Sequence, residues 1–157
     1  MTGKLYHSPA DIIAQMMDDL GLANLEDTGT GEPLTGWTVF PLHMPESPEE
    51  AIQVKDTSGR MHLRSHPTGV MGEHYGIQLL VRSSQDPSTP YVKLKGILDY
   101  FDTDVRRELV TLYDSENHVD RVYRVNAITR MSVAIPAGND GRRFFYSGNM
   151  LASIELT

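Results

Sequence analysis

The chain contains no cysteine. This absence excludes disulfides, thiolate ligands for zinc and a cysteine nucleophile. No apolar run approaches the roughly 20 residues that a membrane-spanning helix needs. The N-terminus also lacks a basic flank followed by an apolar run, so we expect no signal peptide.

The chain also has no excess of basic residues. The formal net charge is −7, and it is unevenly distributed. Residues 1–103 carry seven Lys and Arg against 14 Asp and Glu, whereas residues 104–157 carry seven of each kind. Proteins that grip nucleic acid usually present a basic footprint. The sequence therefore disfavours the binding of polyanions.

The length of 157 residues, of which 39% are hydrophobic, suits one domain with a single core. We expect this domain to span residues 1–157. Residues 37–60 predict two short strands, 37–42 and 51–56. Three prolines fix the backbone between these strands and exclude a helix there: Pro41, Pro45 and Pro48. The stretch contains no nucleophile, general base or phosphate-binding loop.

The first predicted helix covers residues 9–20. Ser8 is expected to cap its N-terminus and Pro9 to occupy its first turn. Apolar side chains then recur at helical spacing, and Gly21 is placed to end the helix in a left-handed conformation.

The clearest strand of the sequence, residues 75–83, precedes the second predicted helix. Ser88 or Thr89 is expected to cap this helix, which continues to about residue 101 with an apolar face. Gly96 weakens the interior of the helix and suggests a close contact with the sheet.

Everything after about residue 105 alternates in the manner of strands. A turn is expected at residues 136–141, where Asn139-Asp140-Gly141 provides strong turn chemistry. The predicted strands are 107–113, 119–128, 131–135, 142–146 and 150–156. Together the elements predict an α+β fold, with two α-helices packed against a mainly antiparallel or mixed β-sheet.

Residues 57–74 are predicted to form a long connector, and they contain His62, His66 and His74, with Glu73 beside the last. The spacing of four between the first two would place both on one face of a helix, as metal sites often do. Pro67 and the nearby glycines argue against a helix here. A small metal-dependent hydrolase with Glu73 as base is therefore the less favoured alternative. Contact with a partner protein is the favoured role of the connector.

Four segments, taken together and in order, resemble the tail terminator proteins of long-tailed bacteriophages, which are also called minor capsid or tail completion proteins. The segments are residues 8–22, residues 37–60, the 75–82 strand with the Tyr-bearing helix after it, and the 138–142 turn. They span nearly the whole chain. The sequence departs from the family in a glycine-rich insertion at residues 28–36 and in its many methionines.

This resemblance implies a structural virion protein at the head-proximal end of the tail, and not an enzyme. Its subunits would form a hexameric ring that caps the tail tube, ends tube polymerisation and provides the interface for head–tail joining. The implied partners are the other subunits, the tail tube protein and the connector or neck protein of the head. Genome DNA would pass through the lumen without specific binding. No cofactor, metal or membrane is implied.

No catalytic residues are carried over from the family. Six residues are candidate contacts with partner proteins: one aspartate, one histidine and four arginines. They are Asp56, His66, Arg60, Arg64, Arg142 and Arg143. The nearer alternative function is that of another neck or head–tail joining protein of the same virion, with the same class of partners but the opposite binding face.

Overall fold

The structure is a computed structural model that describes residues 5–25, 36–46, 48–65, 69–84 and 86–157, and for residues 58–65 and 69–73 it describes the backbone alone. Helix α1 spans Pro9–Asp19. Ser8 caps it as predicted, because its side chain accepts a hydrogen bond from the amide of Asp11 at 3.2 Å. Gly21 follows with φ of 73°, the left-handed conformation that the sequence predicted.

Helix α2 spans Ser88–Asp104 and differs from the prediction at its N-terminus. Neither Ser88 nor Thr89 is the cap. Pro87 occupies that position without a side-chain hydrogen bond, and Oδ1 of Asp86 accepts from the amides of Ser88 and Thr89, both at 2.9 Å. A carboxylate one residue farther back reaches the free amides, so the hydroxyls are not needed as caps.

The strands are β1 (Asn24–Leu25), β2 (Thr38–Pro41), β3 (Ala51–Ser65), β4 (Gly69–Ser83), β5 (Glu108–Tyr113), β6 (Val119–Arg130), β7 (Ile135–Asn139) and β8 (Phe144–Leu156). They form one sheet in the order β1-β2-β3-β4-β8-β6-β5, with β7 paired to β8 beside this path. The pairs β1–β2 and β2–β3 are parallel and the others antiparallel. The predicted α+β class with a mixed sheet is confirmed.

The predicted connector at residues 57–74 is wrong. Strands β3 and β4 continue through this region as one long hairpin, paired from Ala51↔Arg82 to Ser65↔Gly69. The register shifts once, between Thr57 and Arg60. Glycine and serine lower local strand propensity in this stretch, but the facing strand supplies the ladder of hydrogen bonds and overrides it.

Two further strand boundaries differ from the prediction. Strand β7 occupies part of the predicted 136–141 turn, and residues 131–134, predicted as strand, lie between β6 and β7. The predicted strands 142–146 and 150–156 are one continuous strand, β8. Strand β8 pairs with β4 on one side and with β6 and β7 on the other. This pairing on both sides holds Gly148 in extended conformation despite its low propensity.

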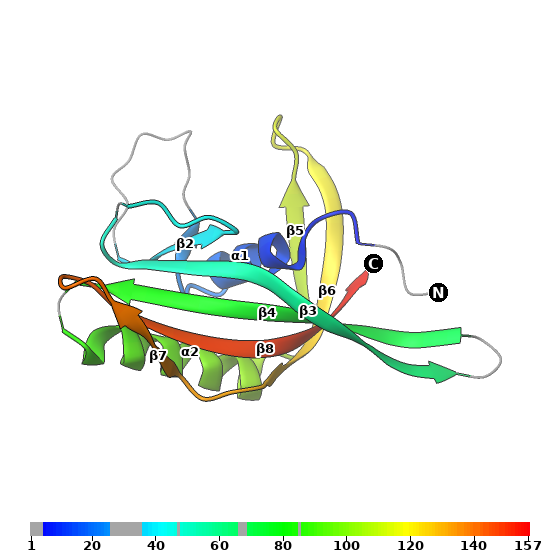
Figure 1. Ribbon diagram of the computed structural model, residues 1–157. Coiled ribbons are helices and arrows are strands. Elements are labelled where there is room, and N and C mark those ends of the chain that lie inside the picture. Colours follow the sequence, from blue (N-terminus) through cyan, green and yellow to red (C-terminus); the bar gives the residue numbers. More distant parts are fainter. Residues whose placement is uncertain (1–4, 26–35, 47, 66–68, 85) are drawn as a thin grey trace.

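Both helices pack on the same face of the curled sheet. Asp56 of β3, whose side chain reaches α1, lies opposite Ile77, which lies opposite Met150 of β8. Tyr146 of β8, four residues before Met150, contacts Tyr91 of α2 with ring centroids 5.5 Å apart. Cross-strand partners share a face, as do residues an even number apart, so both contacts lie on one side. Helix α1 lies near β2, β3 and β5, and α2 crosses β4, β8 and β6 (Figure 1).

One cluster of buried apolar residues fills the space between the helices and this face. Met16 and Met17 of α1 belong to it and are at most 1% exposed. Gly96, expected to make a close contact with the sheet, makes none: a Cβ there would meet nothing within 4 Å. The close approach occurs at Gly148 of β8, where a Cβ would lie 3.0 Å from Cδ1 of Leu98. No helix in the described part of the chain is long and apolar enough to cross a membrane.

Candidate partner-binding surfaces

Five of the six predicted contact residues lie in the described part of the chain, and they fall in three separate places. Asp56 lies in β3 beneath the start of α1. Arg60 and Arg64 lie farther along β3, where their side chains are outside the described residues, as is all of His66. Arg142 and Arg143 follow the end of β7 and precede β8. The prediction therefore does not define one site.

The Asp56 carboxylate is hydrogen-bonded within its own chain. Its Oδ1 accepts a hydrogen bond from the amide of Ala10 at 2.8 Å, in the first turn of α1. Burial raises the pKa of the Asp56 carboxyl, and the nearby Asp11 raises it further, although the hydrogen bond from Ala10 opposes both effects. Asp56 thus joins α1 to the sheet.

The raised pKa of Asp56 predicts a pH-dependent effect of Asp56→Asn. The folded protein holds the proton of this carboxyl more tightly than the unfolded chain does, in which the pKa of an aspartate is about 3.9. The contribution of Asp56 to the free energy of unfolding is therefore largest in acid, and it falls as the pH rises through the folded pKa. The Asn amide oxygen keeps the bond to Ala10 but does not titrate. Urea unfolding from about pH 3 to about pH 7 should show the variant gaining stability relative to the wild type; a flat or opposite trend would contradict the assignment.

Arg143 is also mostly satisfied within the chain, with only 8% of its surface exposed. Its guanidinium contacts the carboxylate of Asp140 at 2.9 Å and that of Glu46 at 3.0 Å. The hydrogen bonds that Arg143 donates to the carboxylates of Asp140 and Glu46 raise the pKa of its guanidinium. Its exposed neighbour Arg142 makes a looser contact with Glu49, at 3.5 Å. Of this pair, Arg142 is the residue available to a partner.

Arg82 of β4 is a structurally important residue that was not among the predicted contact residues. It is 3% exposed, and its guanidinium donates to the backbone carbonyls of Glu46, Pro48 and Glu49. Burial and the nearby Arg143 lower the pKa of Arg82. Arg82 thus fastens the proline-containing segment between β2 and β3 to the sheet. No local pattern announces this role, because the acceptors are backbone atoms of a distant segment.

Arg82→Ala is expected to lower the free energy of unfolding by roughly 2–3 kcal/mol, because the carbonyls that Arg82 now satisfies would lose their partner. The matched control is Arg142→Ala, which removes an arginine from the same end of the sheet. Its ion pair is exposed, so the expected loss is below about 0.5 kcal/mol. Denaturant unfolding of both variants checks this, and equal losses would show that Arg82 does not hold the segment.

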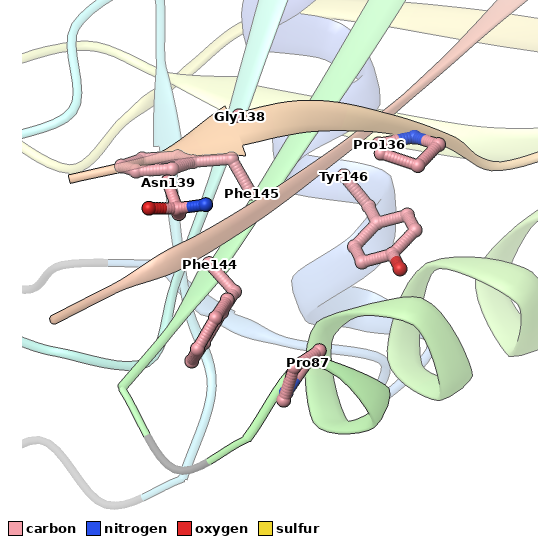
Figure 2. Close-up of a pocket in the computed structure, with 7 residues that line it drawn as sticks. All are labelled: Pro87, Pro136, Gly138, Asn139, Phe144, Phe145 and Tyr146. Atoms are coloured by element: carbon pink, nitrogen blue, oxygen red, sulfur yellow. The ribbon is translucent and has the colours of Figure 1, made fainter. Parts of the chain in front are cut away.

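A hollow of about 260 Å³ lies between the β7–β8 hairpin and the start of α2. In Figure 2, Phe144 and Tyr146 project from β8 toward the first turn of α2, where Pro87 lies. The complete lining consists of Pro87, Pro136, Gly138, Asn139, Phe144, Phe145 and Tyr146. The described lining residues are mostly apolar and aromatic, and they include no Asp, Glu, His, Lys, Ser or Cys. Such a surface suits packing against an apolar side chain and not bond chemistry.

The histidines of the β3–β4 hairpin do not form the helical arrangement considered for a metal, because His62 lies in strand β3. Within the residues whose side chains are described, no group of three His, Cys, Asp or Glu is placed to hold a metal ion. The side chains of His62 and Glu73, and His66 itself, lie outside that part.

The distal half of the β3–β4 hairpin is the most distinctive feature of the molecule. Residues 60–65 of β3 and 69–73 of β4, which we call the ribbon, extend past the rest of the sheet (Figure 1). Strand β8 accompanies β4 only as far as His74, which pairs with Ser153. Strand β2 accompanies β3 only from Ala51 to Val54. Among the described strands, the two halves of the ribbon therefore pair only with each other.

No family model matches the chain, and no curated protein matches it.

Proposed function

We propose that this protein is a ring-forming structural component of a bacteriophage virion, a tail terminator. It assembles with copies of itself into a ring, for which the resemblance implies six subunits. The ring caps the tail tube at its head-proximal end, stops tube growth and provides the docking face for the head connector. The α+β fold agrees with the one expected from the four segments that resemble the family.

The observation that carries the proposal is the ribbon. A two-stranded hairpin without a third strand or a helix against it is marginally stable in water. The ribbon runs beyond the face that both helices cover, so the core of its own subunit does not stabilise it. A neighbouring subunit provides the missing contact. Because the ribbon is unlike the surface that receives it, the contact is heterologous, and a heterologous contact closes into a ring when the rotation allows.

The charge of the chain is consistent with a lumen through which DNA slides. The acidic surplus in residues 1–103 repels phosphates, whereas a basic lumen would bind them and release counterions. In this proposal, genome DNA therefore passes through the lumen without specific binding.

Growth of tail tubes in vitro tests the function. Purified tube protein is allowed to polymerise with and without this protein, and tube lengths are measured by electron microscopy. Substoichiometric protein should shorten the tubes and appear as density at one end only. Tubes of unchanged length, with the protein bound to head connectors instead, would favour the other neck protein and contradict capping.

A further inference from the structure

Strand β5 forms an open edge at one end of the sheet. Of the described strands, only β6 pairs with it, which leaves one side of residues 108–113 open. The opposite end of the sheet is β1, which is two residues long. Strand β7 carries Pro136, which lacks an amide hydrogen and so protects that edge. An open, regular edge is a template for a further strand.

The side chains along this edge are unusually apolar for a surface. Leu109 and Tyr113 of β5 are 59% and 53% exposed, and Val119, directly opposite Tyr113 on β6, is 61% exposed. The intervening Val110 and Leu112 point into the core. One face of β5 thus builds the core while the other presents an apolar surface to the solvent. We call Leu109, Tyr113 and Val119 the β5 patch.

Acidic residues surround the end of the β5 patch. Asp114 and Glu116 lie in the turn between β5 and β6, and Asp120 follows Val119 in β6. All three are exposed. In contrast, residues 60–74 carry Arg60 and Arg64 against a single acid, Glu73, and also contain three histidines. Within the chain Asp120 already contacts Arg121 and His7, and Asp114 and Glu116 lie near His118. The edge and the ribbon therefore match mainly in their unpaired backbone.

We propose that the β5 edge receives the ribbon of a second copy of this chain, so that the sheet continues from one subunit into the next. This inference rests on the proposed ring and specifies its interface. The free edge of β3 from Lys55 to Ser65 is longer than the six-residue edge of β5. The donated strand pairs with the open backbone groups of β5, and its side chains on the outer face pack beside Leu109 and Tyr113. Each subunit donates at one end and accepts at the other, as a closed ring requires.

Chemical crosslinking tests this contact. Because the natural chain has no cysteine, only the introduced thiols can react. Thr111→Cys places a thiol on β5, and Thr57→Cys and Ser65→Cys place one on β3. A short bis-maleimide is added to mixtures of one β5 variant and one β3 variant. We expect covalent dimers in these mixtures, and a ladder of higher species when Thr111→Cys and Ser65→Cys are combined in one chain. The control is Ser88→Cys, at the exposed start of α2, in place of Thr111→Cys. Crosslinks equal to this control would overturn the proposal.

A charge substitution on the β5 patch provides a second readout. Leu109→Arg with Tyr113→Arg should convert the ring to monomers in sedimentation velocity, with an unchanged circular dichroism spectrum. Val133→Arg alters a side chain that is 69% exposed and lies outside β5, and it should leave the ring intact. A wild-type ring that survives the double substitution overturns this inference and leaves the proposed function standing. A wild-type protein that forms no ring, alone or on tail tubes, overturns the proposed function itself.

Discussion

A chain in which residues 61–73 are replaced by Asn-Gly is expected to fold as a monomer and to lose all tube-capping activity. The replacement removes the distal ribbon and joins Arg60 to His74, which are partners in the native register. Asn-Gly is the preferred sequence of a two-residue hairpin turn, so the shortened hairpin closes without strain. The core residues whose side chains the structure describes all lie in the retained part of the chain.

The expected effect on assembly is large because, in the proposed ring, the ribbon supplies one complete side of each contact between subunits. Without it no further strand reaches the neighbouring subunit, and a heterologous ring cannot close. Sedimentation velocity should show one species with the mass of a single chain, and thermal unfolding should remain cooperative. Tail tubes grown with the variant should be as long as those grown without protein.

The matched control replaces residues 26–35 with a Gly-Ser linker of equal length. This change alters a comparable amount of sequence outside the ribbon, and we expect assembly to survive it. If both variants assemble normally, the ribbon is not the contact between subunits. If both are monomeric, assembly depends on more of the surface than the ribbon and the β5 edge.

Gly148→Val is expected to lower the free energy of unfolding by about 3 kcal/mol. Gly148 is the point at which β8 approaches α2 most closely. Its absent Cβ would lie 3.0 and 3.3 Å from the two methyl carbons of Leu98. Leu98 itself is 1% exposed, so its side chain has little space into which it can move. A branched side chain therefore forces α2 away from the sheet.

Two controls make this prediction specific. Gly96→Ala lies in the same helix–sheet layer but meets nothing within 4 Å, and it should raise stability by about 1 kcal/mol through helix propensity. Leu98→Ala leaves a cavity that the new Val fills, so the double variant should lose less than the two single variants added together. Strict additivity in urea unfolding would show that residues 98 and 148 do not compete for the same space.

The local structure was largely predictable from the sequence because its signals are local. The cap at Ser8, the left-handed Gly21 and the apolar face of α1 depend on neighbours within a few residues. The alternation of residues 75–83 likewise predicted one strand, of which Ile77, Leu79 and Val81 are buried. The α+β class follows from the order of these elements.

The surfaces that carry the proposals were not predictable in the same way. The glycines and histidines of the ribbon predict a connector because they lack strand propensity, and the pairing of its two halves with each other makes them strands. Arg82 bonds to carbonyls about 35 residues away, and Asp56 to an amide 46 residues away. The open edge of β5 depends on strand order, which no short window of sequence contains.

Native mass spectrometry of the wild-type protein, alone and released from capped tail tubes, would show directly whether it forms a ring. We expect a closed ring with the mass of six chains in at least the tube-bound sample, and single chains for the variant that lacks residues 61–73. Single wild-type chains in both samples would contradict the proposed ring.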